Sequence, residues 1–226
     1  MKIFFKISLM VKNIIFDLDG TLANTSQDII SSLRFALKKK GLNKIISLRE
    51  FKKVANKGSL NMVKKFLKRN DNKLIKEINF IFLNHYRKNI CVKSSLKENV
   101  LSFLKTCKKK KIKLYVSTNK SEKNAKLLLK KLKILNFFNF VAGNDTFLYK
   151  KPNPLHLNKL KKKFLFKKKE TIFVGDSEVD SNLAKNFKIK FILIKNGYTT
   201  LKPSKINSDF TIARFAQISK ILKKLS

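Results

Sequence analysis

Two short apolar runs in this chain each end in a loop that carries a pair of aspartates. The first run leads into Asp17 and Asp19, and the second, more than a hundred residues later, leads into Asp176 and Asp180. In an open parallel sheet the carboxyl ends of the strands converge on one crevice, so acids from distant parts of the sequence can meet there. The pattern therefore predicts a parallel sheet with an acidic site along one edge.

Apolar runs bounded by turn residues predict six strands along the chain. The strands are expected at Val11–Phe16, Lys111–Ser117, Phe137–Val141, Thr171–Val174, Phe191–Ile194 and Asp209–Ile212. Helical patterns alternate with them at Leu96–Lys108, Ser121–Leu132, Pro154–Phe164 and Val179–Phe187. Alternating strands and helices predict an α/β fold with a doubly wound parallel sheet.

Residues 25–93 interrupt this alternation and contain no convincing strand. Their helical patterns fall at Asp28–Lys39, Leu48–Asn56, Ser59–Arg69 and Lys73–Lys88. Because they lie between the first strand and its next partner, we expect a small helical cap inserted into the core. The predicted division is a catalytic core of residues 1–24 and 94–226 and a helical cap of residues 25–93. The sheet does not need residues 1–9, so Met10 is a second candidate for the start of the native chain.

The chain carries 53 Lys and Arg against 14 Asp and Glu, a formal net charge of +39. Such a charge normally indicates a nucleic-acid or anionic-membrane partner. The lysines are spread along the whole chain and no aromatic-basic RNA motif accompanies them, so we expect no dedicated nucleic-acid partner. No run approaches the roughly 20 apolar residues of a membrane span, and the two isolated cysteines fit a reduced compartment. We therefore expect a cytoplasmic monomer or homodimer without a membrane partner.

Two further strand ends add groups that suit phosphoryl transfer. Thr118 and Asn119 follow the second strand, and Lys151 stands directly before Pro152 in the loop after the third. A carboxylate can attack phosphorus, and a second acid on the same loop can protonate the leaving oxygen and then deprotonate water. Hard carboxylate oxygens hold Mg²⁺, while a hydroxyl and an ammonium bind the remaining phosphate oxygens. The set of residues therefore predicts a Mg²⁺-dependent reaction on a phosphate ester.

Four motifs in this order resemble those of the haloacid dehalogenase superfamily. They are Asp17-Leu18-Asp19-Gly20-Thr21-Leu22, Thr118-Asn119-Lys120, Lys151-Pro152-Asn153-Pro154 and Gly175-Asp176-Ser177-Glu178-Val179-Asp180. The resemblance covers about residues 11–199 and implies a Rossmann-like core with a helical cap. It implies Asp17 as the nucleophile through an aspartyl-phosphate, Asp19 as the acid and base, and Thr118 and Lys151 on the phosphate. It also implies Mg²⁺ held by Asp17, Asp176 and the Asp19 carbonyl, with support from Asp180.

Within the superfamily the chain is most similar to the bacterial phosphoglycolate phosphatases. The supporting stretches are Asn144-Asp145-Thr146, Phe82-Leu83-Asn84-His85-Tyr86-Arg87, Lys151 to Leu157 and Gly197-Tyr198-Thr199. The resemblance implies a small phosphorylated metabolite as substrate, with 2-phosphoglycolate first. The alternatives are a phosphatase or phosphomutase for another phosphomonoester, such as a phosphosugar, a nucleotide or pyrophosphate, and a nucleic-acid-binding protein that uses the charge. The dehalogenase branch is disfavoured because attack on carbon needs no acid at position 19.

The turn around Lys57 is the candidate for reading the substrate. Lys57-Gly58-Ser59 could face the substrate, with Lys57 binding a carboxylate, or could be a turn between helices with Ser59 as N-cap. Both interpretations stay open. Asn119 joins Thr118, Lys151 and Lys57 in the predicted set of phosphate- and substrate-binding residues.

The two histidines and one further lysine are expected outside the chemistry. His85 and His156 fit packing or hydrogen-bonding roles, because a carboxylate already fills the acid-base role. Lys150 is expected in solvent, since the resemblance assigns the phosphate to the residue directly before Pro152.

Overall fold

The computed structural model describes residues 10–67 and 71–225. Residues 1–9, which precede the second candidate start at Met10, and the predicted helix end at Arg69 lie outside this range. In the described part, no helix combines the length and the apolar character that crossing a membrane requires.

A parallel sheet forms the centre of the molecule, in the strand order β5-β4-β1-β6-β7-β8. Its strands are β1 (Asn13–Phe16), β4 (Lys113–Ser117), β5 (Phe140–Ala142), β6 (Thr171–Gly175), β7 (Lys190–Ile194) and β8 (Phe210–Ile212). β1 lies between β4 and β6, in register with both, so Phe16 stands opposite Val116 and Val174. This central position places the end of β1 between the ends of two other strands.

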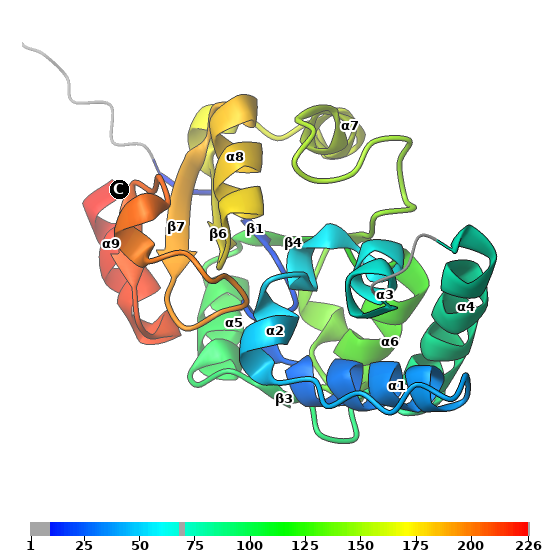
Figure 1. Cartoon of the computed structure of the whole chain (residues 1–226). Helices are drawn as coiled ribbons and strands as arrows, with labels where there is room; N and C mark the ends of the chain where they lie inside the picture. The colour runs from blue at the N-terminus through cyan, green and yellow to red at the C-terminus, as the bar shows by residue number, and fades with distance from the viewer. Residues whose placement is uncertain (1–9, 68–70, 226) are drawn as a thin grey trace, which may run out of the picture.

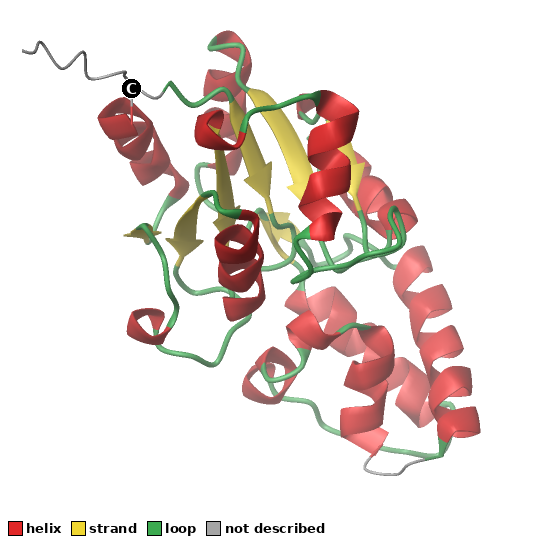
Figure 2. Ribbon diagram, turned by 90° about the horizontal axis from the view of Figure 1, so that it is seen from above, coloured by secondary structure: helices red, strands yellow, loops and turns green. Residues whose placement is uncertain are grey.

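Alternate residues of each strand face opposite layers of helices, as the two-residue period of a strand requires. Ile14 and Phe16 pack on one side with α5 (Val100–Lys109), α6 (Glu122–Lys131) and α9 (Ile218–Leu225). Ile15 packs on the other side with α7 (Leu155–Phe164) and α8 (Glu178–Phe187). Figure 2 shows helices on both faces of the sheet, and the predicted doubly wound α/β fold is confirmed.

Four α-helices and a short 3₁₀ helix form what we call the helical insertion, residues 26–88 between β1 and β4. They are α1 (Ser26–Lys38), α2 (Leu48–Lys52), η1 (Ala55–Lys57), α3 (Ser59–Leu67) and α4 (Asn72–Lys88). α4 packs against both α1 and α3, and Figure 1 shows the insertion to one side of the sheet. Two helix starts are fixed locally: Ser47 and Glu50 form a capping box on α2, and Asp71 accepts the Leu74 N–H on α4.

Two short strands, β2 (Ala23–Asn24) and β3 (Ser95–Leu96), pair antiparallel where the chain enters and leaves the insertion. Beside them the buried Asp28 carboxylate accepts the backbone N–H groups of Lys93 and Ser94, at 2.9 and 2.8 Å. The two connections are therefore tied together at their base. The division of the chain at residues 24/25 and 93/94 stays a prediction.

Several element boundaries differ from those predicted, and two of the larger differences have a local reason. α5 begins at Val100 rather than Leu96, because Leu96 pairs in β3 and Asn99 takes a left-handed conformation with φ 64°. β5 begins at Phe140 because η2 (Leu135–Phe137) precedes it. β1 begins at Asn13 rather than Val11. The remaining 3₁₀ helices are η3 (Lys168–Glu170), η4 (Pro203–Lys205) and η5 (Phe215–Gln217).

Candidate active site

The loop after β1 is a tight turn that needs glycine at position 20. Asp17 continues the strand, since its N–H still donates to the Val174 carbonyl at 2.9 Å. Gly20 then turns the chain with φ +87°, and a Cβ there would lie 2.5 Å from the Asp176 carboxylate. A side chain at this position would therefore be strained and would collide with the acid of β6. The Asp-x-Asp-Gly-Thr motif thus brings the β1 and β6 loops into direct contact.

Asp17, Asp176 and Asp180 form a buried cluster of acids. One carboxylate oxygen from each lies within 4.8 Å of the others, and the three residues are 6%, 1% and 1% exposed. Burial raises the pKa of Asp17 well above its ordinary value, and the neighbouring carboxylates raise it further against the lowering effect of Lys151. Burial, followed by the charge of Asp180, raises the pKa of Asp176 to about 6. Carboxylates this close to one another favour a bound cation.

Hydrogen bonds hold the two acids of the β6 loop in fixed orientations. Asp176 accepts from the Thr21 hydroxyl at 2.9 Å and from the Tyr198 N–H. Asp180 accepts the Ser177 hydroxyl at 2.7 Å in the capping box that begins α8. The stretch around Tyr198, seen above only as a family signature, therefore supports an acid of the cluster.

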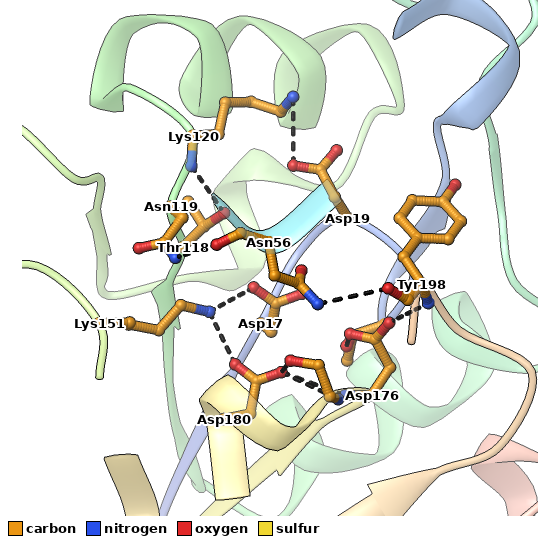
Figure 3. A network of polar contacts seen from close by, with 12 residues as sticks. Asp17, Asp19, Asn56, Thr118, Asn119, Lys120, Lys151, Asp176, Asp180 and Tyr198 are labelled. Carbon is orange, nitrogen blue, oxygen red and sulfur yellow. Dashed lines mark hydrogen bonds and ion pairs between the residues drawn. The ribbon is translucent and has the colours of Figure 1, made fainter. Parts of the chain in front are cut away.

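Lys151 reaches this cluster from the loop after β5. Its ammonium donates to Asp17 at 2.5 Å and to Asp180 at 2.8 Å, with 3% of its side chain exposed (Figure 3). Burial alone would lower the pKa of Lys151, but the charges of Asp17 and Asp180 outweigh it and raise the pKa above its ordinary value. The ammonium therefore stays protonated, and its positive charge offsets one negative charge of the carboxylate cluster. Lys150, next in the chain, is exposed.

The loop after β4 supplies further polar groups to the site. Thr118 is buried, and its hydroxyl accepts the Lys120 N–H at 3.2 Å. The Asn119 amide donates to the Asn56 carbonyl of the helical insertion at 3.2 Å, while its Oδ1 is buried with no partner in the described residues. Both residues line the same cavity as Asp17.

Asp19 lies apart from the acid cluster. One of its oxygens accepts the Thr25 hydroxyl at 2.6 Å, and the other lies 3.1 Å from the Lys120 ammonium. The same ammonium donates to the Tyr86 hydroxyl at 3.0 Å. Sequence reasoning gave no role to Lys120 or Tyr86, although both stand inside stretches that carried the family resemblance.

A cavity of about 390 Å³ separates the sheet edge from the helical insertion. Five of the predicted site residues line it, namely Asp17, Asp19, Thr118, Asn119 and Lys151. Asp176 and Asp180 stand behind Asp17 and do not line it. Lys57 does not line it either: it is exposed at the end of η1, whereas the residues around it that face the cavity are Ala55, Asn56, Gly58 and Ser59. Ser59, expected as an N-cap, is the first residue of α3.

Comparison with known proteins assigns the chain to a family. The sequence profile of the haloacid dehalogenase-like hydrolases matches residues 14–194, so the chain belongs to that family. It is 31% identical to phosphoglycolate phosphatase of Mesorhizobium japonicum, over 87% of this chain and 90% of the relative. It is also 31% identical to phosphoglycolate phosphatase of Aquifex aeolicus, over 92% of this chain and 95% of the relative. The resemblance read from the motifs is confirmed, and with it the class of phosphoric monoester hydrolases.

Solved structures agree with this assignment. A crystal structure titled as a predicted phosphoglycolate phosphatase from Haemophilus somnus superposes with a TM-score of 0.87 at 28% identity, over 94% of this chain and 98% of that one. CbbY from Rhodobacter sphaeroides in complex with phosphate superposes with a TM-score of 0.81 at 20% identity, over 92% of this chain and 96% of that one. At that identity the second likeness concerns the fold alone.

Proposed function

We propose that this protein is a Mg²⁺-dependent phosphatase that hydrolyses 2-phosphoglycolate through an aspartyl-phosphate on Asp17. The observation that carries the proposal is the place of Asp17: it lines a small cavity, with the Lys151 ammonium on one oxygen and two further carboxylates behind it. Cations beside the nucleophile reduce its repulsion with a phosphate dianion. The two free cysteines, Cys91 and Cys107, favour a reduced, cytoplasmic setting.

Two steps follow from the arrangement of the residues. Asp17 attacks phosphorus while the bond from phosphorus to the ester oxygen breaks, and Asp19 gives its proton to that oxygen. Asp19 then takes a proton from water, which attacks the aspartyl-phosphate and releases phosphate and free Asp17. Thr118 and Lys151 hold the remaining phosphate oxygens in both steps. Asp17, Asp176, Asp180 and the Asp19 carbonyl would hold Mg²⁺, which neutralises phosphate charge when bound.

Removal of divalent metal tests the cofactor. We expect exhaustive chelation to stop turnover and Mg²⁺ to restore it, because three buried carboxylates beside a phosphate repel one another without a cation. A second readout does not depend on activity: Mg²⁺ should raise the melting temperature of the wild type but not of Asp176→Asn. Full activity after chelation would contradict the metal assignment.

Substrate choice is supported by the cavity and by the relatives. A volume of about 390 Å³ suits a small ester, and Lys120, Lys123 and Arg87 add cations to its lining. The relatives at 31% identity carry the name phosphoglycolate phosphatase. The test compares kcat/KM for 2-phosphoglycolate with values for phosphosugars, nucleoside monophosphates and pyrophosphate. If kcat/KM for one of these is about tenfold higher, or about 1.4 kcal/mol lower in the barrier, the named substrate is wrong while the assignment as a phosphatase remains.

One observation favours a phosphosugar as the second candidate. Asn119 lines the cavity, and its Oδ1 is buried without a partner in the described residues, whereas 2-phosphoglycolate has no hydroxyl to donate to it. A sugar hydroxyl would satisfy this acceptor. A phosphosugar preference that disappears in Asn119→Ala would support this candidate over the first.

A further inference from the structure

Lys120 and Tyr86 form a polar pair that spans the cavity from the sheet to the helical insertion. Lys120 follows β4, whereas Tyr86 lies in α4, and the ammonium donates to the Tyr86 hydroxyl at 3.0 Å. The ammonium also lies 4.5 Å from the centre of the Tyr86 ring. Only 8% of the Lys120 side chain and 2% of Tyr86 are exposed, yet both residues line the cavity. A buried ammonium in this place needs anions or acceptors on every side.

The pair has donors left over. An ammonium carries three N–H bonds, of which Asp19 and Tyr86 take two among the described residues. The Tyr86 oxygen accepts from Lys120, and its own proton has no acceptor among the described residues. Burial raises the pKa of Tyr86 to about 12, so that proton is present at neutral pH. One N–H and one O–H therefore remain next to each other at the cavity wall.

The proposed reaction indicates which group of the substrate would lie next to these two donors. Asp19 must lie beside the ester oxygen in order to protonate it, and Lys120 lies 3.1 Å from Asp19. In 2-phosphoglycolate the carboxylate carbon is only two bonds from that ester oxygen. A substrate with its phosphorus at Asp17 therefore brings its carboxylate to the side of Asp19 where Lys120 stands, as the relative positions in Figure 3 allow.

We propose that Lys120 and Tyr86 bind the carboxylate of the substrate and so select phosphorylated carboxylic acids over plain alkyl phosphates. This inference rests on the proposed phosphatase function and assigns its specificity site. Because Tyr86 belongs to the helical insertion and Lys120 to the sheet, a bound carboxylate links the two. The expected gain is that of charge-assisted hydrogen bonds in a buried place.

The test uses two substrates that differ only in the carboxylate. We would measure kcat/KM for 2-phosphoglycolate and ethyl phosphate with the wild type, Tyr86→Phe and Lys120→Met, in saturating Mg²⁺. The ratio of the two values cancels every effect that both substrates share, including any effect that Lys120 exerts through Asp19. Tyr86→Phe keeps the ring, so it remains informative if Lys120→Met folds poorly. Lys88→Met, an exposed lysine of α4 outside the cavity lining, is the matched control.

The expected result is a fall in the ratio by about tenfold in Tyr86→Phe and on the order of a hundredfold in Lys120→Met, the range of hydrogen bonds to charged groups. Lys88→Met should leave the ratio unchanged. A ratio that stays within about twofold in both cavity variants would overturn the inference, because a purely structural role lowers both substrates alike. A wild type that hydrolyses both substrates equally well would also overturn it, and would leave the phosphatase function intact. A wild type that hydrolyses neither would instead sink the proposed function.

Discussion

The two walls of the cavity differ in how firmly their side chains are fixed. On the sheet side, Asp17 and Lys151 are nearly fully buried, paired with each other, and backed by Asp176 and Asp180. On the side of the helical insertion the lining is mostly apolar or neutral, with Arg87 exposed at the rim. The charged residues of the sheet wall fit a reaction that is common to many phosphate esters. The residues of the insertion wall fit a different task, which is to select the ester that enters.

Backbone geometry reinforces the sheet wall. Gly175 and Gly197 both stand where a Cβ would collide with an acid of the cluster, Gly175 with Asp180 and Gly197 with Asp176. These glycines let the backbone approach the carboxylates more closely than any residue with a Cβ would allow. Changes on this wall should therefore have large effects, and changes at exposed positions of the insertion small ones.

The largest effect is expected from Asp17→Asn. The amide is nearly isosteric but is a poor nucleophile and a weaker metal ligand, so we expect a loss of about 10³-fold or more in kcat, roughly 4 kcal/mol. The fold should survive, because Lys151 keeps its bond to Asp180 and one of three crowded charges is removed. Initial rates and a melting curve check both parts. Activity within about tenfold of wild type would place the nucleophile elsewhere.

The neighbouring lysines 150 and 151 offer a matched pair. Lys151→Met removes the cation shared by Asp17 and Asp180, which should cost about 3–5 kcal/mol of stability as a broken buried pair. It should also lower kcat/KM by about 10²–10³-fold, since an electrostatic clamp on the phosphate is lost. Lys150→Met should change stability by no more than about 0.5 kcal/mol, because Lys150 is exposed. Urea unfolding and initial rates on both variants measure the contrast, and equal effects would contradict it.

The difference between the walls also explains what sequence could predict. Strand ends fix where Asp17, Thr118, Lys151 and Asp176 emerge, because parallel strands bring their carboxyl ends to one edge. Six strands and the acidic edge could therefore be predicted from apolar runs and the residues that follow them. The two-residue strands β2 and β3 could not, since a period of two needs a longer run to be seen.

The insertion wall depends on how helices pack, which short-range patterns do not give. Lys57 and Tyr86 both stand in helical stretches, but only the packing of α4 turns Tyr86 toward Lys120. η1 ends at Lys57 and Gly58 follows with φ +82°, which leaves the Lys57 side chain outside the cavity. The sequence predicted Lys57 as the cation for the substrate carboxylate. The cations that line the described cavity are instead Arg87, Lys120, Lys123 and Lys151.

His156 should make the stability of the sheet wall depend on pH. It is fully buried in α7, and its Nδ1 donates to the Tyr149 carbonyl at 2.8 Å, two residues before Lys151. Burial lowers its pKa to about 4. A lowered pKa means that the folded protein prefers the neutral ring, so this contribution is complete above about pH 6.5 and is lost as the pH falls toward 4.

We expect the His156→Gln variant to lose this dependence of stability on pH. The difference in unfolding free energy between wild type and variant should shrink by up to about 3 kcal/mol between pH 6.5 and 4. Urea titrations across this range measure it, and the difference cancels the opposite contributions of Asp17 and Asp176, which both chains share. A pH-independent difference would show that His156 is not buried as a neutral ring.

The smallest effect is expected from Lys57→Ala. The Lys57 side chain is exposed and absent from the cavity lining, so its charge is screened by water and salt. We expect kcat/KM for 2-phosphoglycolate to change by less than about twofold, within the range of exposed charges. The informative measurement is the same ratio to ethyl phosphate used for Tyr86→Phe, because general attraction of anions acts on both esters. A selective loss of about tenfold for 2-phosphoglycolate would mean that Lys57 reaches the carboxylate when substrate is bound. The turn at Gly58 would then move on binding, and the insertion wall would owe its specificity to a lysine that the structure places in solvent.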